Sequence, residues 1–156
     1  MIKSIGSAAG LTIAILAVAA CTGGVDMAEE ARPNPGGEGR GIVFFQTADF
    51  DAVTAFYRDR VGCSIWLDQG ACLILRHGNQ LLGFCRSAKA ETCGTLTFFY
   101  RTAAEVDAMY EKFKDVAVSE PRENTKYKIY HFYARDPENR SVEFQAFLHP
   151  VDWDIL

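Results

Sequence analysis

Hydrophobic and polar positions in the first half of the chain alternate between a strand-like and a helix-like spacing. The run 41–47 is rich in β-forming residues, and apolar residues then recur at helical spacing between Val53 and Val61. Asp49 precedes this stretch and is a residue type that commonly caps a helix, while Gly62 follows it and can end one. Three short apolar runs separated by turn residues come next, at 63–67, 72–76 and 80–86. The spacing predicts a β-α-β-β-β unit.

The same order of elements recurs in the second half. A strand is predicted over 95–100, and Thr102 with Glu105 has the form of a capping box at the start of a helix. Three further strands are predicted, a weak one near 117–120 and clear ones at 128–134 and 141–148. The fold class is therefore α+β, built from two βαβββ modules. Since each module has one helix to cover one face of its sheet, the other face needs a ligand or a partner.

The first twenty residues have the form of a secretory signal peptide rather than of folded structure. Lys3 precedes the uncharged run 5–20, which ends in small residues. The sequence V-A-A-C that ends at Cys21 resembles the bacterial lipobox, in which the cysteine receives a lipid and becomes the new N-terminus. We therefore predict a signal peptide over 1–20 and a lipid on Cys21, which places the mature protein in the cell envelope, anchored to a membrane on the extracytoplasmic side.

Two alternatives to this export signal are consistent with the same residues. The apolar run could be kept as a membrane anchor, although it is short for a span, which needs about 20 residues. Translation could also begin at Met27 and leave the protein in the cytoplasm.

The rest of the chain divides by composition. Residues 21–40 are rich in Gly and Pro and lack apolar periodicity, which predicts a flexible tether. The globular domain is predicted over 41–149, and a short C-terminal tail follows over 150–156.

The charge of the chain excludes one class of partner. The 156 residues carry 16 Lys and Arg against 20 Asp and Glu, a formal net charge of −4. Nucleic-acid binding needs a basic face, so we expect no nucleic-acid partner. Eleven Phe, six Tyr and two Trp are typical of a β-rich domain with an aromatic interior.

Two motifs carry a resemblance to a known family. The first combines Asp49 with F-Y at 56–57 and V-G at 61–62, and the second is D-P-E-N-R-S-V-E-F over 136–144. Together they resemble the vicinal oxygen chelate superfamily, which includes glyoxalase I, extradiol dioxygenases, fosfomycin-resistance enzymes and bleomycin-binding proteins. The resemblance implies two modules that form an open cup-shaped mixed sheet, with one helix per module on the outer face. The family usually has Gly where this chain has Asn139, and Asn also tolerates a left-handed turn conformation.

The resemblance also implies where a divalent metal would be held, on the first and last strand of each module. Aligned outward from the two motifs, these positions fall on Ile42, Gly83, Thr95 and Glu143. Only Glu143 is a usual ligand type, and a divalent site normally needs at least three protein ligands. We therefore expect no metal and no other cofactor, unless unexpected residues complete a site around Glu143.

Side-chain alternation indicates which residues would line the cup instead. With Glu143 facing inward, the lining is apolar and aromatic with a few polar groups, which is the composition of a small-molecule pocket. The predicted ligand-binding residues are Phe44, Gln46, Arg76, Thr95, Phe99 and Tyr133. The expected ligand is a small apolar or aromatic molecule.

Of the three histidines, His131 is the candidate for chemistry. It lies in the middle of a predicted strand, and a pairing opposite Glu143 would bring both into the cup. A carboxylate beside an imidazole orients the ring and suits acid–base catalysis, but the same pair also occurs as a structural cross-strand hydrogen bond. We expect Glu143 to bond to His131 or to Arg76. His77, in a turn, and His149, after the last strand, are expected to be solvated.

The cysteines other than Cys21 leave two readings open. Their even number in an exported protein permits two disulfides, and Cys72 could lie opposite Cys85 across a hairpin turn. Alternatively, all of them serve as small buried apolar residues, because a domain of about 110 residues can hold a core without disulfides. The four residues are Cys63, Cys72, Cys85 and Cys93.

Three functions are consistent with these observations. The first is a metal-free small-molecule-binding protein similar to the bleomycin-binding branch. The second is a glyoxalase-like lyase or isomerase that uses Glu143 as general base beside His131. The third is a non-catalytic interaction module of the envelope, and the open face could also serve a homodimer.

Overall fold

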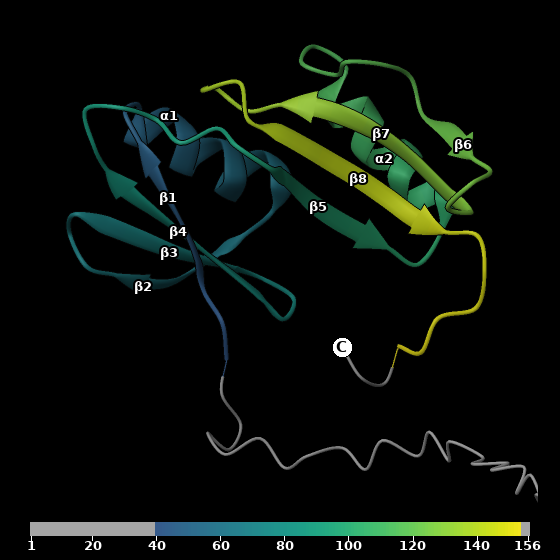
Figure 1. Cartoon of the computed structure of the whole chain (residues 1–156), viewed down its shortest axis with the longest axis horizontal. Coiled ribbons are helices and arrows are strands. Elements are labelled where there is room, and N and C mark those ends of the chain that lie inside the picture. Colours follow the sequence, from purple (N-terminus) through teal and green to yellow (C-terminus); the bar gives the residue numbers. More distant parts are fainter. Residues whose placement is uncertain (1–39, 154–156) are drawn as a thin grey trace, which may run out of the picture. The chain divides into compact units, whose positions relative to one another are not determined.

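The computed structural model describes residues 40–153 as two β-α-β-β-β modules (Figure 1). The predicted signal peptide, the tether up to residue 39 and the tail beyond Trp153 lie outside the described residues. Among the residues described, no helix has the length and apolar character needed to cross a membrane.

The first module is a four-stranded mixed sheet in the order β1-β4-β3-β2. Strand β1 runs parallel to β4, and the other neighbours are antiparallel. Its elements are β1 Val43–Thr47, α1 Phe50–Ala55, the π-helix η1 Phe56–Val61, β2 Ser64–Asp68, β3 Cys72–His77 and β4 Gln80–Arg86.

The second module repeats this topology with the strand order β5-β8-β7-β6. Strand β5 is parallel to β8, as β1 is to β4. Its elements are β5 Thr95–Tyr100, α2 Ala103–Phe113, β6 Arg122–Asn124, β7 Ile129–Arg135 and β8 Ser141–Phe147. The predicted α+β class and the two modules are confirmed, with the strands divided into two sheets.

The helix ends are fixed by the residues that the sequence indicated. The Asp49 side chain accepts a hydrogen bond from the backbone of Ala52, and Thr102 and Glu105 form a reciprocal capping box. Gly62 ends the first helical segment in the left-handed conformation, with φ 94°. The second half of that segment is π-helical, a difference that the apolar spacing does not reveal.

The core lies on the helix side of each sheet and is continuous between the modules. In the first module Tyr57 stacks on Phe84, with ring centroids 4.7 Å apart. Phe56 meets Phe113 of α2 edge to face at 5.4 Å, and Phe98 of β5 lies 6.3 Å from Tyr57. Aromatic residues therefore join the two halves of one core, as their abundance predicted.

The weak strand expected near 117–120 is misplaced. Ala117 makes only an isolated bridge to Ala134, and the paired strand β6 follows it in the chain. Val116, just before this stretch, packs against the core, whereas Val118 within it is exposed. Without a repeating alternation, the apolar run did not mark the residues that pair with β7.

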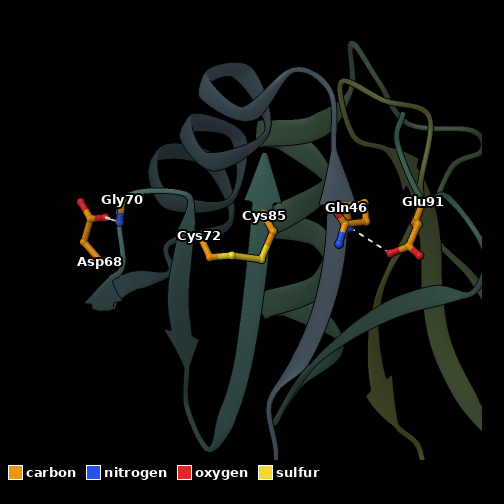
Figure 2. Close-up of a disulfide and its surroundings, with 6 residues drawn as sticks. All are labelled: Gln46, Asp68, Gly70, Cys72, Cys85 and Glu91. Carbon is orange, nitrogen blue, oxygen red and sulfur yellow. Dashed lines mark hydrogen bonds between the residues drawn. A yellow bond between two sulfur atoms is a disulfide. The ribbon is translucent and has the colours of Figure 1, made fainter. Parts of the chain in front are cut away.

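One of the two predicted readings of the cysteines is confirmed in part. Cys72 and Cys85 are register partners on β3 and β4 and form a disulfide (Figure 2). Cys63 is buried and Cys93 exposed, and both are free thiols. Burial raises the pKa of the Cys63 thiol to about 12, so this sulfur is protonated and unreactive at neutral pH.

Replacing both disulfide cysteines with serine is expected to lower the free energy of unfolding by about 2 kcal/mol. The bond links residues 13 positions apart, so the oxidised unfolded chain loses conformational freedom. Denaturant unfolding of the oxidised wild type and the double variant measures the difference, and the reduced wild type should match the variant. Equal stability of the oxidised and reduced wild type would contradict this account.

Candidate functional site

Four polar side chains meet on the face of the second sheet that α2 does not cover, and we call them the Glu143 cluster: Thr97, His131, Tyr133 and Glu143. Thr97 and Tyr133 are the register partners of Glu143 on β5 and β7, and directly paired residues point to the same face of a sheet. The opposite face carries Phe144, whose ring packs on Phe113 of α2.

Both carboxylate oxygens of Glu143 have a partner within the cluster. His131 Nδ1 lies 2.6 Å from Oε1, and the Thr97 hydroxyl donates to Oε2 at 2.9 Å. Glu143 and His131 are buried, with 8% and 5% of their surface exposed. The Tyr133 ring meets the His131 ring edge to face at 5.2 Å, and burial together with the negative charge of Glu143 raises the pKa of Tyr133.

The predicted bond between Glu143 and His131 is present, but the predicted pairing is wrong. His131 lies opposite Gln145, and Tyr133 lies opposite Glu143. The imidazole therefore reaches the carboxylate along the diagonal, a distance that long side chains can span. Arg76 is exposed on β3 and is not a partner of Glu143 within the described residues.

The strand register places two further residues beside the metal positions that the resemblance implied. Gly83 pairs with Phe44, and Glu143 pairs with Thr97. Phe44 and Thr97 lie two residues beyond Ile42 and Thr95, and residues two apart along a strand point to the same face.

The residues at the four implied positions do not fit a divalent metal. Ile42, Gly83 and Thr95 supply no strong ligand, which leaves the single carboxylate of Glu143. The register partners Phe44 and Thr97 add none. The Phe44 ring lies over Gly83, where any Cβ would overlap it. Within residues 40–153, no group of three His, Cys, Asp or Glu side chains is placed to hold a metal.

Gly83→Ala is expected to displace the Phe44 ring and to lower the free energy of unfolding by about 1–2 kcal/mol. In a Phe44→Ala background the same substitution meets less obstruction, because the three atoms nearest to the added Cβ all belong to that ring. A double-mutant cycle by denaturant unfolding therefore shows coupling between the two positions. Additive effects of Gly83→Ala and Phe44→Ala on the free energy of unfolding would show that the Phe44 ring does not occupy the space above Gly83.

A cleft of about 1200 Å³ borders the Glu143 cluster. It runs along β5 and the turn between β3 and β4, and its lining includes Arg76, His77, Thr97, Phe99, Arg101 and Trp153. Thr97 connects the two features, because it lines the cleft while its hydroxyl bonds to Glu143. Two of the predicted ligand-binding residues, Arg76 and Phe99, are therefore placed together at one cavity.

The expectation that His77 is a solvated turn residue is wrong. Its ring contacts Phe98 edge to face at 5.0 Å and lies 6.4 Å from Tyr100. Burial lowers the pKa of His77, so the imidazole is neutral at pH 7. No sequence signal marked His77, since contact with β5 depends on how the modules pack. His149 is exposed, as expected.

The other predicted ligand-binding residues lie elsewhere. Phe44 and Gln46 line a second hollow of about 540 Å³, beside the segment that follows β4. The backbone N–H of Gln46 donates to Glu91 Oε2 at 2.9 Å (Figure 2). Thr95 is exposed on β5, and neither it nor Tyr133 lines the cleft or the hollow.

The motif over 136–144 is held in place by the bonds of a buried arginine, which the sequence analysis did not identify as a functional or structural residue. Arg140 is 2% exposed and bonds to Asp136 Oδ2 at 2.9 Å and to Glu138 Oε2 at 2.5 Å. It also donates to the backbone carbonyls of Gln46 at 2.7 Å and Glu91 at 2.6 Å. We call this group the Arg140 clamp, because it ties the start of β8 to the first module.

Glu138 extends the clamp to the start of the first helix. Its carboxylate accepts bonds from the Thr47 hydroxyl and from the backbone of Ala48 and Asp49. Burial opposes ionisation of this carboxyl, but these bonds and Arg140 outweigh it, and the pKa of Glu138 lies below its usual value. The resulting stability is present at neutral pH and is lost as the pH falls through that lowered pKa.

Comparison with known proteins supports the resemblance at the level of the fold. No protein-family model matches the chain, and no curated protein matches it by sequence. Among solved structures, the chain is similar to lactoylglutathione lyase from Agrobacterium tumefaciens, with 25% identity, a TM-score of 0.57, and coverage of 70% of this chain and 93% of that one.

Two further structures are similar in fold. A glyoxalase/bleomycin resistance protein/dioxygenase family enzyme from Burkholderia phytofirmans PsJN has 21% identity and a TM-score of 0.61 over 69% of this chain and 97% of that one. A glyoxalase/bleomycin resistance protein/dioxygenase from Alicyclobacillus acidocaldarius has 15% identity and a TM-score of 0.60, over 72% of this chain and 93% of that one. The chain thus has the vicinal oxygen chelate fold.

Proposed function

We propose that the protein binds a small molecule without a metal, in the cleft beside β5, and is held in the cell envelope by a lipid on Cys21. One observation carries the metal-free part of this proposal. The four positions at which the family resemblance implies ligands carry Ile42, Gly83, Thr95 and Glu143, and the Phe44 ring fills the space above Gly83. A cleft lined by aromatic and polar side chains suits an organic ligand.

The disulfide supports the export part of the proposal. Structural disulfides persist in oxidising compartments such as the bacterial periplasm and are rare in the cytosol. The bond between Cys72 and Cys85 is therefore consistent with the signal peptide predicted over 1–20. Expression of wild type and Cys21→Ala in a bacterial host that lipidates exported proteins tests it. The wild type should carry a lipid and fractionate with membranes, whereas the variant should carry no lipid and should be either released or stalled as the precursor. Recovery of the wild type in the cytoplasm with residues 1–20 still attached would contradict the proposal.

A titration with the neutral fluorescent probe N-phenyl-1-naphthylamine tests binding in the cleft. We expect saturable binding that Phe99→Ala weakens several-fold, because this ring lines the cleft. The matched control is Trp66→Ala, which removes an aromatic ring that is 50% exposed on β2, away from the cleft. Absence of saturable binding, or an equal loss in the control, would contradict the proposal.

A second candidate, a glyoxalase-like lyase or isomerase, is favoured by the 2.6 Å contact between His131 and Glu143. The fold similarity to a lactoylglutathione lyase points the same way. In this reaction Glu143 would remove a proton from carbon beside a carbonyl and return it to the neighbouring atom, while His131 holds the carboxylate in place. Turnover that Glu143→Gln abolishes, with probe binding retained, would favour this candidate over simple binding.

A further inference from the structure

The cleft concentrates positive charge in a chain that is acidic as a whole. Arg40, Arg76 and Arg101 line it, although the formal net charge of the protein is −4. The acidic side chain in the lining is Glu105, and its carboxylate is occupied by the backbone N–H and hydroxyl of Thr102 in the capping box. The lining therefore has an excess of positive charge.

Among the described residues, no carboxylate oxygen lies within 4.0 Å of these guanidinium nitrogens. None of the three forms a salt bridge with another residue in the range 40–153, whereas Arg60, Arg86 and Arg140 do. All three are exposed. Arginine presents a planar fork of donors that matches carboxylate and similar oxyanions. Such groups facing a common cavity attract an anion and can bind it through charge-assisted hydrogen bonds.

Aromatic rings lie beside this charge. The Arg101 guanidinium lies 4.6 Å from the centre of the Trp153 ring, and Phe99 lies 5.8 Å from the same ring. The guanidinium lies over the Trp153 ring, where a cation is attracted to the ring face, and the two aromatic rings provide a surface on which a planar molecule can stack. The cleft therefore provides both a positive charge and aromatic rings to a molecule bound in it.

We propose that the cleft selects planar aromatic anions, such as ring systems that carry a carboxylate or a sulfonate. The oxyanion is bound by Arg76 and Arg101, and the ring packs against Phe99 and Trp153. This inference rests on the proposed function and adds to it the chemical class of the ligand.

A matched pair of fluorescent probes tests the role of charge. 1-Anilinonaphthalene-8-sulfonate has the ring system of N-phenyl-1-naphthylamine with one added sulfonate. We expect the sulfonate probe to bind the wild type more tightly at low salt, and added salt to reduce the difference. Arg76→Gln and Arg101→Gln should each weaken the sulfonate probe about three- to tenfold and change the neutral probe less than about twofold.

The control variant is Arg58→Gln, which removes the same charge from an exposed position on η1 outside the cleft. It should leave both affinities unchanged within about twofold. If the neutral probe binds in the cleft but the sulfonate probe binds no tighter, or if Arg58→Gln acts like the cleft variants, the anion inference is overturned and the proposed function stands. If neither probe binds, the proposed function itself fails.

Discussion

Replacing Arg140 with methionine is expected to lower the free energy of unfolding by about 3–5 kcal/mol. The substitution keeps much of the side-chain volume but leaves the carboxylates of Asp136 and Glu138 without their buried cation. It also removes the donors to the carbonyls of Gln46 and Glu91. Removing one member of a buried ionic network leaves the remaining charges uncompensated in a poorly solvated place, which is why the effect is large.

Denaturant unfolding of the purified protein measures this change. The matched control is Arg135→Met, an exposed arginine of β7 with one bond, 3.4 Å long, to the carbonyl of Asn139. It should change the free energy of unfolding by less than about 0.5 kcal/mol. Similar losses in the two variants would show that the Arg140 clamp does not hold the modules together.

Glu143→Leu is expected to lower the free energy of unfolding by about 3 kcal/mol. Leucine is similar in size but leaves His131 and the Thr97 hydroxyl without the acceptor that each has now. Glu143→Gln should have a smaller effect, because the amide keeps the shape and still offers one acceptor and a donor. Denaturant unfolding of the three proteins measures both differences.

A double-mutant cycle that combines Glu143→Leu with His131→Leu distinguishes the hydrogen bond between the two side chains from ordinary core packing. Once Glu143 has been replaced by leucine, removing the imidazole relieves an unsatisfied polar group and should add little further loss. We expect a coupling of at least about 1 kcal/mol between the two positions. Independent, additive losses would show that the 2.6 Å contact contributes no specific stabilisation.

Local signals along the chain predicted most of the elements of the fold, because each depends on neighbouring residues. The Asp49 cap, the Thr102 capping box and the left-handed Asn139, with φ 67°, all formed as expected. The π-helical turn before Gly62 was not predictable, because its apolar residues recur much as they would in an α-helix. Strand β6 was also missed, since its sequence Arg-Glu-Asn has no apolar alternation.

Register limited how well the candidate site could be predicted. An error of two residues leaves the hydrophobic pattern of a strand intact. For this reason His131 was expected opposite Glu143, where the structure has Tyr133. Of the two partners expected for Glu143, His131 and Arg76, His131 makes the bond, along the diagonal.

The cleft itself was not predictable from sequence. It joins Arg40, before the first strand, to Trp153, after the last one, and both reach it only through the packing of the two modules. The burial of Arg140 was equally hidden, because charged residues in a turn motif are usually solvated. Long-range packing therefore decided which of the candidate residues share a cavity.

The central claim, metal-independent binding in the cleft, is tested most directly by one titration. N-phenyl-1-naphthylamine is titrated into the purified protein before and after dialysis against EDTA, and the metal content of the same samples is measured. The account predicts an affinity that is unchanged within about twofold after chelation, with no stoichiometric metal bound before it. Loss of probe binding on chelation, restored by adding back Zn²⁺, Mn²⁺ or Fe²⁺ in stoichiometric amount, would contradict it.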